Sequence, residues 1–170
     1  MDRKLSPLAA VGLGLGAGLI GTGFMTAWQE TVARFKRSMT PRHMDNGDDP
    51  WARAPAPAQV GRLLVQTVLR RDVPSERIQL FTNAVHWGFG TVMGAGYGLA
   101  QATVRGKPIV TGPLFGLGVW AQSYATLVPM GLYKPPWRYP ARSIAKDVSY
   151  HLVYGAGTAA GYKLLRSTSR

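Results

Sequence analysis

A chain of 170 residues allows one domain and is long enough to form a soluble core. It contains no cysteine, which excludes disulfides and thiolate metal sites, and its net charge of +12 raises the question of nucleic-acid binding. However, the basic residues flank apolar segments and do not form one stripe. We therefore expect them to face anionic lipid and not nucleic acid.

Three long segments contain no charged residue, although charged residues make up 16% of the chain. They are residues 5–29, 78–104 and 108–133, with 25, 27 and 26 residues. A helix needs about 20 apolar residues to cross a bilayer, so each segment is long enough. A fourth uncharged segment, 148–162, is shorter, but its flanking residues can extend it. The pattern predicts an all-α polytopic membrane protein, a single membrane domain formed by a four-helix transmembrane bundle with helices at about 7–33, 76–103, 109–130 and 142–165.

Most of the 21 glycines fall within these four segments. Glycine weakens a helix in water by about 1 kcal/mol relative to alanine, whereas in lipid it lets helix backbones approach closely. Many of these glycines have the four-residue spacing of small-xxx-small packing motifs. The spacing predicts helix packing at Gly12, Gly14, Gly16, Gly18, Gly90, Gly94, Gly98, Gly112, Gly116, Gly157 and Gly161.

The remaining segments predict loops and one surface helix. Arg3 and Lys4 resemble the start of a signal peptide, but the apolar run that follows is too long and lacks a small-x-small cleavage site. We therefore expect a retained first helix. Proline, glycine and aspartate predict an irregular loop over 40–57. The apolar spacing of residues 58–71 predicts an amphipathic helix, at the membrane interface or against the bundle.

Basic residues are unevenly divided between the two sides of the predicted bundle. The two tails and the turn at 105–107 carry 7 Lys and Arg residues, and the two loops on the other side carry 13. The positive-inside rule therefore favours a cytoplasmic position for the long 34–75 segment and an outer position for both termini.

The second and fourth predicted helices share a five-point pattern. A histidine is followed by an aromatic residue at +3, glycine at +4, and Gly-Tyr at +10 and +11, beginning at His86 and again at His151. Both helices would cross the membrane in the same direction. The match predicts a parallel repeat of two helical hairpins, related by an axis along the membrane normal.

Several small and aromatic residues in the C-terminal half form a further pattern. They are His86, Gly90, Tyr97, Gly112, Phe115, Gly116, Trp120, Pro129, Gly131, His151 and Gly155. Through these residues the region of about 85–160 resembles the YagU-like family of bacterial inner-membrane proteins. The resemblance implies a multi-pass protein of the bacterial inner (cytoplasmic) membrane and no settled biochemical activity. That family tends to carry another histidine where this chain has Gln122, Ser123 and Tyr124, which weakens the case for a shared metal or proton site.

Four ionisable residues should lie at similar depth near one membrane face: Glu30, His86, Asp147 and His151. Asp147 and His151 are four residues apart and share one side of their helix. Ionisable groups within a span are costly and tend to mark pathways, relays or ligand sites. The set could pass protons or ions, or hold a divalent metal, and the two histidines could ligate haem iron or the metal of another macrocycle. The structural alternative is that these groups only form hydrogen bonds and salt bridges near the helix ends.

The sequence contains no G-x-S-x-G, H-E-x-x-H or Walker motif. We expect a non-enzymatic membrane protein, either an accessory or structural subunit of a membrane complex or a small self-associating bundle. Its expected partners are the lipid bilayer, anionic lipids and a membrane protein or second copy. One alternative is a small transporter or a proton or ion channel that uses the four ionisable residues. The other is a haem- or metal-binding membrane subunit, although the sequence requires no cofactor.

Overall fold

In the computed structural model, residues 5–37, 49–104 and 106–168 are described, and all regular secondary structure in these ranges is helical. The all-α prediction is therefore confirmed. The elements are α1 (Pro7–Arg37), α2 (Ala56–Leu69), α3 (Ile78–Thr103), α4 (Pro108–Leu127) and α5 (Ala141–Thr168), with 3₁₀ turns at Ser75–Arg77 and Pro136–Arg138. The predicted helix bounds differ from these by a few residues. Of the predicted 40–57 loop, residues 40–48 lie outside the described ranges and residues 56–57 belong to α2.

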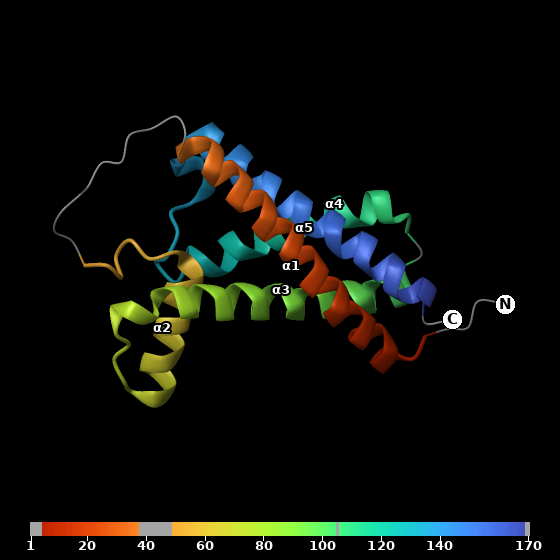
Figure 1. The fold of residues 1–170 in the computed structure, drawn as a ribbon, viewed down its shortest axis with the longest axis horizontal. Helices are drawn as coiled ribbons and strands as arrows, with labels where there is room; N and C mark the ends of the chain where they lie inside the picture. The colour runs from red at the N-terminus through yellow and green to blue at the C-terminus, as the bar shows by residue number, and fades with distance from the viewer. Residues whose placement is uncertain (1–4, 38–48, 105, 169–170) are drawn as a thin grey trace.

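The four long helices alternate in direction along the chain (Figure 1). α1 packs against both α3 and α5, and α4 packs on α5. The start of α1, the end of α5, the end of α3 and the start of α4 lie at one end of the bundle, on the right in Figure 1. We call this the termini end. The opposite end, which carries residues 49–55 and 128–140, is called the loop end.

The backbones of α1 and α3 touch at glycine. A Cβ atom at Gly94 would overlap the backbone of Gly18, and a Cβ atom at Gly18 would lie 2.6 Å from the carbonyl oxygen of Gly90. Gly98 approaches the backbone of Ala10 in the same way. Because side chains cannot occupy these positions, glycine is what allows the two helices to cross this closely.

The α4–α5 crossing is built similarly. A Cβ atom at Gly155 would overlap the carbonyl oxygen of Gly112 and lie 2.6 Å from the backbone nitrogen of Gly116. On the other face of α5, Gly157 and Gly161 lie against α1. In both hairpins, glycine therefore sets the distance between the helices.

Two of the predicted packing glycines on α1 have different surroundings. Gly16 meets the side chain of Leu165, whereas Gly12 is exposed and faces open space. Two residues correspond to about 200° of rotation around a helix, so the turn that brings Gly14 against α3 directs Gly12 away from it. Gly12 thus lies outside the helix contacts of the described residues.

Side-chain size is distributed in an unusual way between the interior and the outer surface. The largest fully buried side chains are Tyr154, Thr22 and Thr158, and much of the remaining interior is glycine and alanine. Large apolar side chains point outward from all four long helices, among them Leu8, Phe24, Val92, Leu99, Ile109, Leu114 and Leu164. Soluble proteins more often bury such side chains and rarely expose large continuous apolar areas.

By length and hydropathy, α1 alone among the described helices is apolar enough to cross a membrane, over Pro7–Phe35. The prediction of four spans is therefore not confirmed by this measure. α3 and α4 contain no Asp, Glu, Lys or Arg, but glycine, threonine, tyrosine, tryptophan and glutamine lower their mean hydropathy. α5 contains Asp147 and four basic residues, mostly near its ends.

α2 does not pack through the apolar stripe that its sequence suggests. Its buried positions are Ala56, Ala58 and Gly61, which lie against a small core formed with Trp51 and Val73 near the start of α3. Leu63, Leu64, Val68 and Leu69 are exposed instead. α2 packs through alanine and glycine because these small residues let it approach α3 closely. The larger side chains of α2 therefore lie on its outer face.

The α1–α3 crossing gives a direct test. Gly94→Ala should lower the free energy of unfolding in detergent by about 1–3 kcal/mol, because the new methyl group meets backbone that cannot move aside. Gly96→Ala, on the same helix but facing open space, is the matched control and should cause no loss. Equal destabilisation by both variants would contradict this account of the crossing.

Candidate functional site

A polar cavity of about 130 Å³ lies between the four long helices toward the loop end. All four helices and the loop after α4 contribute side chains to it. It is lined by Thr22, Met25, Gln29, His86, Phe89, Gly90, Val119, Ser123, Tyr133, Asp147, His151 and Tyr154. We call it the histidine cavity. It brings together three of the four ionisable residues that the sequence singled out.

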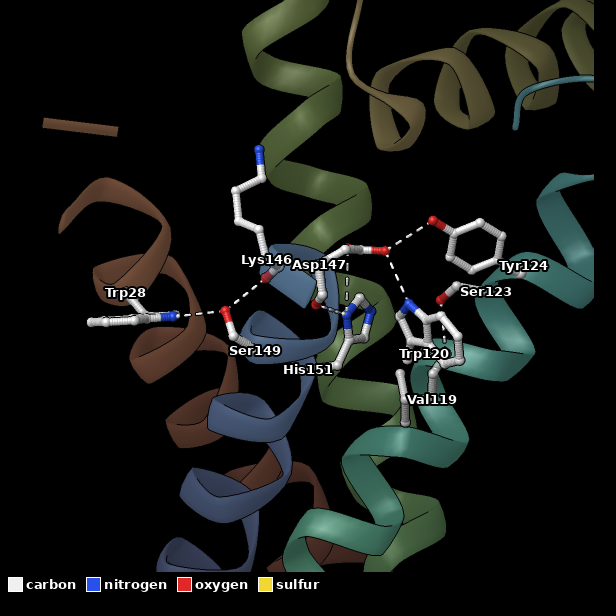
Figure 2. A network of polar contacts seen from close by, with 9 residues as sticks. All are labelled: Trp28, Val119, Trp120, Ser123, Tyr124, Lys146, Asp147, Ser149 and His151. Atoms are coloured by element: carbon white, nitrogen blue, oxygen red, sulfur yellow. Dashed lines mark hydrogen bonds and ion pairs between the residues drawn. The ribbon is translucent and has the colours of Figure 1, made fainter. Parts of the chain in front are cut away.

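Asp147 is the centre of the polar contacts at this cavity (Figure 2). The indole nitrogen of Trp120 and the hydroxyl of Tyr124 both donate to its Oδ2 atom, at 3.1 and 3.2 Å. Trp120 and Tyr124 are four residues apart on α4, so both reach the same carboxylate from one side of that helix. The carboxylate therefore ties α4 to the first turns of α5.

His151 lies one turn further along α5. Its Nδ1 atom is 2.9 Å from the backbone oxygen of Asp147 and 3.7 Å from the carboxylate oxygen Oδ1. If Nδ1 donates to that backbone oxygen, the neutral ring carries its lone pair on Nε2. The contact holds the ring in a fixed orientation at the cavity wall.

His86 approaches the same cavity from α3. Its Nε2 atom lies 3.4 Å from the hydroxyl of Thr26 on α1, and both His86 and His151 line the cavity. The two histidines that begin the repeated sequence pattern thus face one cavity. The two tyrosines that end the pattern, Tyr97 and Tyr162, are also in contact, with ring centroids 5.8 Å apart in an edge-on arrangement.

Glu30 does not join this group. It is exposed and pairs with Arg34, at 3.4 Å, while its neighbour Gln29 lines the cavity. Successive helical residues differ by about 100°, which separates the two side chains. No cluster of three or more His, Cys, Asp or Glu side chains suited to a metal occurs in the described part of the chain.

The metal site and the haem site stay predictions. The cavity volume is about 130 Å³, whereas sites for cofactors and drug-sized ligands usually span about 300–1,000 Å³. A porphyrin between the two histidines would therefore need the helices to separate. The space fits water molecules or a small cation much better.

The loop after α4 covers the cavity at the loop end. Gly131 has a positive φ of 72°, a conformation that favours glycine, and this turn directs Tyr133 back toward Asp147. Burial raises the pKa of Tyr133 to about 12, with smaller contributions from the negative charge of Asp147 and from Tyr139. Tyr133 is thus the residue through which this loop contributes to the cavity wall.

Toward the termini end, aromatic side chains fill the interior. The hydroxyl of Tyr154 donates to the backbone oxygen of Gly90 at 2.7 Å and closes the histidine cavity on the side of the termini end. Phe115 packs between Tyr154 and Tyr97 in tilted arrangements, with ring centroids 5.9 and 5.0 Å away. The cavity is therefore a pocket that ends at Tyr154 and not a continuous pore.

Several residues of the site were not identified as site residues from the sequence. In the sequence, Trp120 and Tyr124 belong only to the comparison with the YagU-like family, and no pattern singles out Gln29 or Tyr133. The four-residue spacing of Trp120 and Tyr124 was the available signal, because it places two donors on one helix face. Their pairing with Asp147 depends on the relative height of α4 and α5.

Comparison of the chain with protein-family models, curated proteins and solved structures gave no match in any of the three. The resemblance to the YagU-like family accordingly stays a prediction based on its motifs.

Replacing Trp120 should test the role of the carboxylate. Trp120→Phe removes one donor to Asp147 and should lower the free energy of unfolding by about 1–3 kcal/mol, since a charged acceptor loses a partner. Trp137→Phe is the matched control, because Trp137 is 81% exposed and should change stability little. Denaturation in detergent measures both, and a neutral Trp120→Phe variant would show that the network adds no stability.

Proposed function

We propose that this chain is a four-helix transmembrane bundle of the bacterial inner membrane with a non-enzymatic role, as a self-associating or accessory subunit of a membrane assembly. The distribution of side chains supports the membrane location. Large apolar residues on all four long helices face outward, and lipid is the solvent that would cover them favourably. The uncharged segments 78–104 and 108–133 are also long enough to span, despite their modest hydropathy.

The charges of α5 fit the same location. Arg142 and Lys146 lie near its start and Lys163 and Arg166 near its end, where long basic side chains can reach headgroups. Asp147, the one acidic residue of this helix, accepts two hydrogen bonds from α4. The long 34–75 segment is assigned to the cytoplasmic side by its basic residues.

The proposed assembly role rests on the outer face of α4. Gly118, Ala121, Gln122 and Ala125 are all exposed, and a Cβ atom at Gly118 would meet nothing within 4 Å. In lipid, small residues let a neighbouring helix approach, and glutamine can bond across the contact. The Gln122 amide donates to Thr126 at 3.0 Å, which leaves its other hydrogen-bonding groups for a partner.

An apolar cleft of about 210 Å³ lies beside this face, between α2, α3 and α4. Phe89, Gln122, Leu127 and Met130 are among its lining residues. The cleft exists because α3 and α4 make few direct contacts, whereas α1 packs along α5. We further propose that the hairpin of α1 and α3 and the hairpin of α4 and α5 arose by duplication. Because α3 and α4 make few direct contacts, the side of α4 next to the cleft is left open for a partner.

Self-association or complex formation should therefore depend on α4. Gly118→Leu and Gln122→Leu should each shift the purified complex toward the monomer, because one blocks close approach and the other removes the polar contact. Gly96→Leu, at another open glycine on α3, is the matched control and should leave the assembly intact. Native mass spectrometry in mild detergent measures the distribution. A monomeric wild-type chain without partners would contradict the proposal.

A second candidate function is a proton or small-cation relay at the histidine cavity. The observation that favours it is the convergence of His86, Asp147 and His151 on one pocket in the loop-end half of the bundle. Passage across the whole bundle would require Tyr154 to leave the oxygen of Gly90.

The relay can be tested by flux into liposomes. Asp147→Asn keeps acceptors for Trp120 and Tyr124 but removes the charge, and His151→Ala removes the ring, so both should abolish proton or cation flux. Glu30 lies outside the cavity, so the Glu30→Gln variant should retain the flux. Wild-type liposomes without flux, or unchanged flux in both cavity variants, would rule this function out.

A further inference from the structure

A second cavity lies at the termini end of the bundle. Its volume is about 360 Å³, which falls within the usual range for small-molecule sites. α3, α4 and α5 all contribute to its wall. The lining residues are Tyr97, Gln101, Gly106, Pro108, Ala159, Tyr162, Lys163, Arg166 and Ser167.

The charge of this cavity is positive. Lys163 and Arg166 both line it, and the described residues of its wall include no carboxylate. The sequence contains no acidic residue after Asp147, so α5 supplies no counter-charge at this end. Tyr162 and Arg166 are four residues apart and present the same face of α5 to the cavity.

Tyr162 provides a second and independent indication of a ligand. Its side chain is 4% exposed, and its hydroxyl is buried without a hydrogen-bond partner among the described residues. The equivalent tyrosine of α3 differs, because the hydroxyl of Tyr97 bonds to Thr111 at 2.9 Å. A buried hydroxyl without a partner is costly, and an acceptor in the cavity would satisfy it.

We propose that this cavity binds the phosphate group of an anionic ligand, with Lys163 and Arg166 supplying charge and Tyr162 a neutral donor. Pro108 lines the cavity at the start of α4 and has no N–H group, so this residue adds no hydrogen-bond donor. Arginine and lysine are the side chains that proteins use most for phosphate. In the proposed membrane bundle, the termini end lies at headgroup level and the phosphate belongs to a phospholipid. The phosphate site itself does not require that location.

The test uses the full-length chain in a non-ionic detergent. Dihexanoyl phosphatidic acid and inorganic phosphate are the probes, and dihexanoyl phosphatidylcholine is the lipid control; isothermal titration measures each Kd. The double variant Lys163→Gln/Arg166→Gln should weaken binding at least about tenfold, and Tyr162→Phe should weaken it severalfold. Lys134→Gln/Arg138→Gln removes the same charge from exposed positions at the loop end and should change nothing.

The outcomes separate the two sources of phosphate. Binding of phosphatidic acid with this residue dependence identifies a lipid headgroup, and binding of inorganic phosphate alone identifies a soluble ligand. Binding of neither probe, or equal losses in the two double variants, would overturn the site. Alkaline carbonate extraction of the same variants from membranes tests membrane insertion separately. Release of the chain by carbonate would contradict the membrane bundle, whereas loss of phosphate binding in the titration would contradict the phosphate site.

Discussion

Contact between helix backbones at glycine is the constraint on which the rest of this structure depends. Gly18 meets Gly94 in the first hairpin, and Gly112 meets Gly155 in the second. Such contacts leave no space for large side chains between the helices, so leucine, isoleucine and phenylalanine are displaced to the outer surface. The same constraint sets the distances at which hydroxyl and carboxylate groups of neighbouring helices can meet inside the bundle.

Within that frame, tyrosine takes the place that aliphatic residues have in a soluble core. Tyr97, Tyr154 and Tyr162 fill the half of the bundle toward the termini end, and their hydroxyls each need a partner when buried. Tyr154 finds one in an α3 backbone oxygen, which divides the interior into two separate cavities. One cavity contains histidine and aspartate, and the other contains lysine and arginine. The division gives the two ends different chemistry.

The sequence predicted the helices well because uncharged segments and proline positions are local signals. It also indicated that His86, Asp147 and His151 would lie together, since the repeated pattern and the four-residue spacing fix their height. Rotation about each helix axis was harder to predict. It separates Gln29 from Glu30 and directs Gly12 away from α3, and it depends on contacts with distant segments. For the same reason, the sequence left open whether the apolar side of α2 faces the membrane interface or the bundle, and in the structure Leu63, Leu64 and Val68 are exposed.

The central position of α1 has a consequence for biogenesis. It is the helix that meets the hydropathy criterion unaided, and it contacts both α3 and α5. In a bilayer, such a helix can reside alone while the rest of the chain is still being synthesised. The less hydrophobic helices would then enter by docking onto it, exchanging lipid for glycine-lined grooves. In the proposed bundle, α1 would thus serve as the template on which the helices that follow it in the chain assemble.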